Sequence, residues 1–378
     1  MREGRNLFAP SHLFYADDIL LFGKAERKTT LCIKISSHII KRFPVKVISW
    51  NKSFVVFGED IGVVKQNRVA RRLGVKRGSL PFNYLGVPLF LGRVKCAHLE
   101  GISLKITNHL ASWKGKSMSQ AGRVCLVNSV ISSMFLYSFS IYRWHVQLLK
   151  ELTGKIRNFI WTGSIHERKL VTVAWKECIN PIDMGGLGVK DVRIFNDALL
   201  QKFTWNLLSK LDFSIEFLAC RFVDRLQKGT CTFLKSSVWP SIKYTYPLIM
   251  SPYLWLVSLD SNMNCWDNPW LSNVLKDHME IPPAFASLSI SELHGNSTAC
   301  EMLPSNFQME MDRYIYTNSD ILIWKSTLNG SFSSKECYKM YCFASSATPS
   351  WLTGLRRPYI TPANFLLIWR IWKNMITV

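Results

Sequence analysis

The sequence predicts an α+β fold that is mainly helical, with a small antiparallel sheet near residues 12–57. Two short apolar runs, 13–15 and 19–22, flank the adjacent carboxylates Asp17 and Asp18. Aromatic and β-branched runs of this length around a turn-forming pair are typical of a β-hairpin. Farther along the chain, apolar residues recur every third or fourth position, which indicates helices. A chain of 378 residues is long enough for two or three domains.

The helical periods fall in segments 26–42, 99–113 and 148–160, and a strand-like run follows the first of them at 54–57. Segment 124–142 carries no charge over nineteen residues, which is close to the length that spans a bilayer. Its apolar side chains recur at helical spacing, opposite a polar face. The apolar set is Leu126, Val127, Val130, Ile131, Met134 and Phe135, and the polar set is Asn128, Ser129, Ser132 and Ser133. We therefore expect an amphipathic core helix and no membrane partner.

Positive charge is concentrated in the first half of the chain. Residues 1–177 contain 29 basic and 10 acidic side chains, whereas residues 178–378 contain 18 and 16. Within 61–150, 14 basic residues accompany a single acidic one, Glu100. A stretch of this length with so few acids favours a surface that faces nucleic acid, although a solvated helix face is the alternative.

The ten cysteines are scattered, with no Cys-x-x-Cys pair and no signal peptide at the start of the chain. This pattern indicates reduced thiols in the nucleus or cytoplasm, without a disulfide framework or a complete zinc site. No other targeting signal is seen. The eight histidines are equally scattered, and we expect them to be structural.

Residues 12–22, His-Leu-Phe-Tyr-Ala-Asp-Asp-Ile-Leu-Leu-Phe, resemble the catalytic hairpin of reverse transcriptases, in the version of plant non-LTR (LINE-type) retroelements. The resemblance implies that Asp17 is the main metal ligand of a polymerase palm, that Asp18 is its companion, and that Mg²⁺ is the cofactor of a two-metal mechanism. The family's third carboxylate lies on a strand upstream, and here eleven residues precede His12. We therefore expect an incomplete two-metal site. On the residues alone, an ordinary Asp-rich turn remains the alternative.

Further segments resemble blocks of the same family in the same order. Lys52 matches a lysine near the incoming triphosphate, residues 84–89 look like the family's YLGVPL segment, and 119–123 resemble the start of its thumb helix. In that helix Ser119 could be the N-cap and Arg123 would lie near the positive helix end, which suits a backbone phosphate. The nucleic-acid-binding residues that we predict are Lys52, Arg71, Arg72, Lys76, Arg77 and Arg123.

Two later segments complete the pattern. The glycine-rich segment Gly185-Gly186-Leu187-Gly188 matches neither the glycine spacing of the Rossmann dinucleotide-binding motif nor that of the P-loop. We therefore interpret it as a turn. Segment 321–332, with Asn329-Gly330 in the middle, predicts a hairpin, and residues 333–336 predict a capping box for a helix through Tyr341. This end resembles the opening of the zinc-binding module that follows many plant LINE-type enzymes. The ligands of that module would lie farther on, so we expect no zinc.

These observations predict four regions: the end of a polymerase palm (1–60), a basic helical thumb-like region (61–165), a connector (166–310) and a truncated zinc-binding-type module (311–378). The leading hypothesis is a fragment of an RNA-directed DNA polymerase, inactive by itself, that an upstream polymerase portion could complement in trans. One alternative is a non-catalytic remnant that binds RNA or an RNA–DNA hybrid. Another is the product of a non-functional pseudogene.

Overall fold

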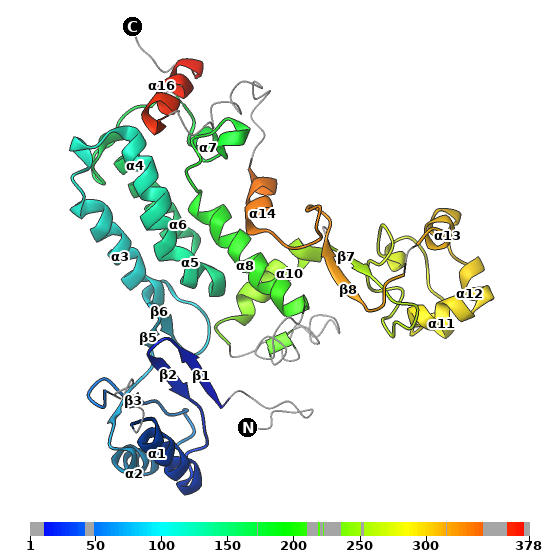
Figure 1. Cartoon of the computed structure of the whole chain (residues 1–378), viewed down its shortest axis with the longest axis horizontal. Helices are drawn as coiled ribbons and strands as arrows, with labels where there is room; N and C mark the ends of the chain where they lie inside the picture. The colour runs from blue at the N-terminus through cyan, green and yellow to red at the C-terminus, as the bar shows by residue number, and fades with distance from the viewer. Residues whose placement is uncertain are drawn as a thin grey trace. The chain divides into compact units, whose positions relative to one another are not determined.

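The computed structural model describes residues 11–41, 49–171, 173–209, 218–219, 222, 236–250, 253–314, 316–342 and 361–373. It confirms an α+β fold that is mainly helical, with sheets of two strands each (Figure 1). The chain divides into two compact units. The first comprises residues 1–99 with 212–237, and the second comprises 100–211 with 238–378. The four predicted regions stay predictions.

The first unit contains the predicted hairpin. Strands β1 (His12–Tyr15) and β2 (Asp18–Leu21) are antiparallel, with Tyr15 opposite Asp18, so that Ala16 and Asp17 form a two-residue turn. Ala16 has a φ of 52° at the first turn position, where a two-residue hairpin loop requires a positive φ. A side chain adds strain in this conformation.

The strand after the hairpin differs from the prediction. Helix α1 (Arg27–Lys41) leads to β3 (Phe54–Val55), which is shorter than the expected run and pairs in parallel with β4 (Lys76–Arg77). Helix α2 (Val63–Leu73) makes the crossover that a parallel pair needs. Segment 54–57 therefore does not extend an antiparallel sheet with the hairpin. Gly74 ends α2 in a left-handed conformation, with a φ of 73°.

The first unit contains a second hairpin. Strands β5 (Phe82–Tyr84) and β6 (Val87–Leu89) are joined by Leu85 and Gly86, which both have positive φ, as a type I′ turn requires. Val87 is buried, and Phe90 stacks on the His98 ring with 3.9 Å between the ring centroids. The YLGVPL segment is therefore a tight hairpin with a buried end.

Helix α8 (Val192–Ser209) is the central element of the second unit. It packs against four helices: α5 (Ser132–Ile141), α6 (Val146–Thr162), α10 (Trp239–Met250) and α14 (Ser334–Tyr341). The buried Asn196 amide of α8 donates to the carbonyls of Phe139 and Tyr142, and its oxygen accepts from the Trp144 N–H. This polar contact joins α8 to the end of α5. The unit also holds α7 (Trp175–Cys178) and α16 (Pro362–Trp372), while α3 (Cys96–Ser112) crosses the unit boundary.

The uncharged segment is one continuous helix, Gln120–Ile141, with a π-helical turn at Val127–Ile131 between α4 (Gln120–Leu126) and α5. Val127, Ile131 and Phe135 are buried as predicted. Val130 is 36% exposed and Ser132 only 7% exposed, which reverses their predicted faces. A π turn holds an extra residue and so rotates the following positions. Within the described residues, this helix alone is long and apolar enough to cross a membrane, and its buried face packs against neighbouring helices.

The predicted hairpin at 321–332 is wrong. Strand β8 (Ile321–Trp324) pairs instead with β7 (Tyr253–Leu256), far away in the sequence, and Gly330 only closes a turn through the hydrogen bond from Trp324 N–H to its carbonyl. The predicted helix through Tyr341 is confirmed as α14, with Ser333 accepting from Glu336 N–H at 3.3 Å.

A tryptophan-rich core lies between the two strands in the sequence. The indole of Trp266 donates to Phe285 O at 2.6 Å, and that of Trp270 donates to Cys265 O at 3.0 Å. The short helices α11 (Ile290–Gly295), α12 (Ser297–Glu301) and α13 (Ser305–Asp312) cover this core. Single 3₁₀ turns occur at Gly115–Ser117, Ile182–Met184, Leu275–Asp277 and Pro283–Phe285.

Candidate nucleic-acid interface and carboxylate pair

The two predicted metal ligands lie at the tip of the first hairpin. Asp17 is in the turn and Asp18 begins β2, and both residues are exposed. Carboxylate oxygens are ligands that Mg²⁺ prefers, and the ion would supply charge neutralisation at a phosphate. The pair therefore fits the cation in kind. No group of three or more His, Cys, Asp or Glu side chains that could hold a metal occurs among the described residues.

Five of the six predicted nucleic-acid-binding residues lie in the first unit. Arg71 and Arg72 are exposed in the last turn of α2, and Lys76 and Arg77 follow as exposed residues of β4. Lys52 is exposed in the turn before β3, the strand that pairs with β4. The fold thus gathers these residues around α2 and its flanking strands. Their binding of nucleic acid stays a prediction.

Arg77 differs from the other cations of this group because its guanidinium is already engaged. It donates to Asn67 Oδ1 at 2.7 Å and to Gln66 Oε1 at 2.6 Å, and both acceptors belong to α2. These hydrogen bonds connect β4 to the helix before it. Arg77 therefore supports the local fold as well as adding positive charge.

The sixth residue, Arg123, lies in the second unit and has a structural role that the sequence did not reveal. Ser119 caps α4 as predicted, accepting from Gly122 N–H at 3.1 Å. The Arg123 guanidinium donates to three main-chain carbonyls, those of Gly115 at 2.8 Å, Met118 at 3.0 Å and Ile160 at 3.0 Å. Partial burial lowers the pKa of Arg123. A guanidinium has five N–H donors, and these contacts use three of them.

The glycine-rich loop is a turn, as predicted, and its main chain is committed to internal hydrogen bonds. The N–H groups of Gly185, Gly186, Leu187 and Gly188 all donate to carbonyls of residues 178–182. A Cβ on Gly186 would lie 1.9 Å from Asn180 O, so the approach of the two segments requires glycine there. A loop with these N–H groups occupied has no cradle to offer a phosphate.

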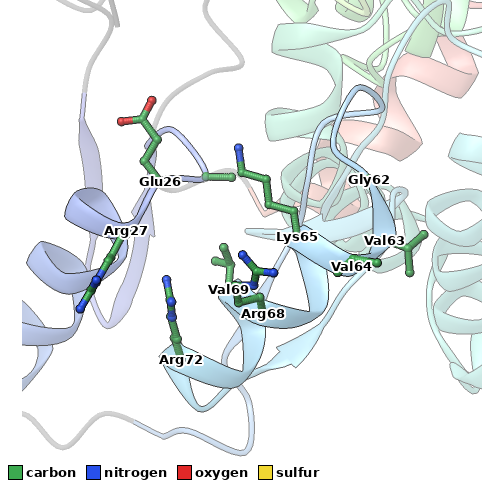
Figure 2. A pocket seen from close by; sticks show the side chains of 10 residues that line it. Glu26, Arg27, Gly62, Val63, Val64, Lys65, Arg68, Val69 and Arg72 are labelled. Carbon is green, nitrogen blue, oxygen red and sulfur yellow. The ribbon is translucent and has the colours of Figure 1, made fainter.

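A pocket of about 600 Å³ lies between α1 and α2 in the first unit (Figure 2). Its charged lining residues are Glu26, Arg27, Lys65, Arg68 and Arg72. Sequence reasoning assigned a binding role only to Arg72. Lys65, Arg68 and Arg72 have spacings of three and four residues, which places them along one helix face and could have indicated a shared site. Nothing in the sequence placed Arg27 beside them.

No protein-family model matches the chain. The chain is 23% identical over 273 residues to the Arabidopsis thaliana protein named "Putative ribonuclease H protein At1g65750", covering 67% of this chain and 44% of that protein. It is also 27% identical over 152 residues to the "Uncharacterized mitochondrial protein AtMg00310" of the same plant, covering 39% of this chain and 96% of that protein. The chain thus spans less than half of the first relative.

Proposed function

We propose that this chain is part of the reverse-transcriptase region of a plant-type non-LTR retroelement and that it binds RNA or an RNA–DNA hybrid through backbone phosphates. The observation that carries the proposal is the hairpin with Asp17 and Asp18 exposed at a two-residue turn. The similarity to a protein named as a ribonuclease H supports it, since that name describes an enzyme of nucleic acid.

The binding part of the proposal rests on the charge of the first unit. Lys52, Arg71 and Lys76 are exposed on or beside α2, β3 and β4. Contacts from such residues to phosphates position a strand without reading its sequence. We expect nonspecific dissociation constants of about 10⁻⁴ to 10⁻⁶ M at physiological salt.

The binding test measures fluorescence anisotropy of a labelled 12-nucleotide RNA, and of the same RNA paired with DNA, over a range of salt concentrations. The test variant, called the surface variant, is Lys52→Gln, Arg71→Gln and Lys76→Gln combined. It leaves Arg77 and Arg123 unchanged because their side chains hold the fold. The logarithm of affinity should fall linearly with the logarithm of salt, with a smaller slope for the surface variant. No affinity of the native chain even at low salt would refute the proposal.

The polymerase part of the proposal concerns residues 1–378 by themselves. The two-metal mechanism needs ligands beyond one carboxylate pair, so we expect no RNA-templated primer extension with Mg²⁺ from this chain alone. Extension that disappears with Asp17→Ala would show instead that the chain holds a working centre. Extension restored by adding an upstream palm segment, and lost again with Asp17→Ala, is the result expected if the chain is one part of a polymerase.

The alternative function is a non-catalytic RNA-binding remnant. It shares the binding test and differs in the complementation test, because no added segment would restore extension. A pseudogene product without function would bind no RNA at all. Detection of the endogenous polypeptide by mass spectrometry would count against that last alternative.

A further inference from the structure

We infer that the pocket between α1 and α2 is a binding site for the phosphates of a single nucleic-acid strand, held by Arg27, Lys65, Arg68 and Arg72. This inference rests on the proposed function and assigns a specific site to it. The pocket belongs entirely to the first unit. Its volume of about 600 Å³ lies in the range of small-ligand sites and exceeds what one phosphate fills.

Positive charge dominates the lining of the pocket. Four cations and one carboxylate line the pocket, and none of the four cations forms an ion pair among the described residues. Arg68 and Arg72 are four residues apart on α2, where like charges repel and destabilise a helix. A bound polyanion would remove this repulsion. Cations assembled in this way are the footprint of a phosphate site.

The four cations of the pocket come from two helices. Figure 2 shows Arg27 on α1 and Lys65, Arg68 and Arg72 on α2, with Lys65 and Arg72 extending into the space between the two helices. The buried Val69 lies on the same turn as Arg68 and also lines the pocket, so α2 is packed and its charged side chains start from a fixed support. Three cations therefore line the α2 wall of the pocket, and Arg27 adds a fourth positive charge at its α1 side.

The rim of the pocket is apolar where α2 begins. Val63 is 59% exposed and Val64 is 73% exposed at the first turn of α2, and both line the pocket. Gly62 precedes them as N-cap without a side chain to accept from the first-turn N–H groups, which leaves the positive end of the helix uncompensated. An apolar rim beside a cationic wall matches a nucleotide, whose ribose and base are less polar than its phosphate.

The test compares two triple variants with equal loss of charge. The pocket variant is Arg27→Gln, Lys65→Gln and Arg68→Gln combined, and the control is the surface variant defined above, whose residues lie in the same unit but do not line the pocket. The RNA is a 12-nucleotide oligouridylate, and inorganic pyrophosphate serves as competitor. Circular dichroism at matched temperature shows that both variants are folded.

Both variants should weaken RNA binding, and the pocket variant should reduce the log–log salt slope by about 0.7 for each phosphate no longer held. Only the pocket variant should lose competition by pyrophosphate. Glu26→Gln, which removes the one carboxylate of the lining, should strengthen binding of both probes. Arg68→Lys, which retains the charge, should keep most of the RNA affinity.

Three results would overturn the inference. If the pocket variant keeps native RNA affinity while the surface variant loses it, the pocket is not a strand site, although the proposed function stands. If the pocket variant loses affinity for ATP but not for RNA, the phosphates belong to a free nucleotide. If the native chain binds no RNA, the proposed function fails and the strand site fails with it.

Discussion

The hydrogen bonds of Arg123 are a feature of a single residue that the sequence did not predict. The motif around it indicated a phosphate contact at a helix start, and the spacing of Ser119 to the helix was right. The three carbonyls that Arg123 contacts come from the turn at 115–118 and from the end of α6, 37 residues away at Ile160. No local pattern in the sequence encodes such a long-range contact. The sequence therefore predicted the Ser119 N-cap but not the three hydrogen bonds that Arg123 donates to main-chain carbonyls.

Replacing Arg123 by Ala should destabilise the second unit. Three partly buried carbonyls would lose their charged donor, and each hydrogen bond to a charged group contributes about 1.5–3 kcal/mol. These contributions do not add, because water can replace the donor at partly exposed carbonyls, so we expect a total loss of about 2–4 kcal/mol in the free energy of unfolding, measured by urea denaturation. Arg157→Ala, at an exposed position of α6, is the control and should change it by less than about 0.5 kcal/mol. Equal effects of the two substitutions would contradict a stabilising role of the three hydrogen bonds that Arg123 donates.

Two glycines should respond in opposite directions to the same substitution. A Cβ at Gly186 would meet Asn180 O at 1.9 Å, so Gly186→Ala must displace main chain and should cost at least about 1–3 kcal/mol. Gly154 lies inside α6 with no atom near its Cβ position, so Gly154→Ala should stabilise by about 0.5–1 kcal/mol. Urea midpoints for both variants decide this, and a destabilised Gly154→Ala would show that α6 is packed differently.

Among the elements, the sequence predicted the helices and the local β1–β2 pairing well, and the distant strand partners poorly. The predicted helical segments 26–42, 99–113 and 148–160 coincide with α1, α3 and α6 within the described residues, because their periods are local properties. Strand β8 pairs with β7, which is more than sixty residues earlier, and β3 pairs with β4 across α2. Such pairs depend on tertiary contacts. The exposure of Val130 could not be predicted for a different reason: a π turn at Val127–Ile131 changes which side chains face the core, and the spacing of apolar residues does not reveal such a turn.

Buried thiols on separate elements of the second unit predict alkaline instability. Burial raises the pKa of Cys178, Cys265 and Cys337 from 9.0 to about 12. Between these values an unfolded chain releases the thiol protons while the folded chain keeps them, so the unfolded state binds fewer protons and stability falls as pH rises. Their contribution is fully present below pH 9 and is lost between about 9 and 12.

Urea midpoints measured from about pH 7 to pH 11 should therefore decline above pH 9. Cys178→Ala should make that decline shallower, because one of the ionising groups is removed. Cys125→Ala, at an exposed position, should leave the slope unchanged. A decline of equal steepness in all three proteins would assign it instead to tyrosines such as Tyr253 and Tyr338, whose pKa is also raised by burial.

In the whole molecule, the described residues of the two units form apolar cores of different size. The buried apolar side chains of the described first unit are few, with Val69, Val87 and Phe90 among them, whereas the second unit buries several tryptophans, including Trp144, Trp266 and Trp324. Smaller cores give less stability. Most of the basic residues that we propose to bind nucleic acid thus belong to the unit whose described residues form the smaller apolar core.

This difference predicts the order of unfolding. In hydrogen–deuterium exchange at moderate urea, peptides from α2 should exchange before peptides from α8. RNA affinity should be lost at the lower urea concentration, while the second unit is still folded. Added RNA should protect α2 and leave α8 unchanged, because a ligand stabilises the part of the molecule that binds it. Simultaneous exchange of both helices would mean that the units unfold as one.

The first hairpin, with Asp17 and Asp18 at its tip, is a two-stranded ribbon. The β1–β2 ladder has four residue pairs and no third strand among the described residues, and Phe14 and Tyr15 are 60% and 49% exposed. Isolated two-stranded ribbons are marginal in water and form within about 1–10 μs, so they open and reclose rapidly. We therefore expect this ribbon by itself to hold the carboxylates of Asp17 and Asp18 less firmly than a larger sheet would. A further strand paired to its edge would hold the two carboxylates in one geometry for longer.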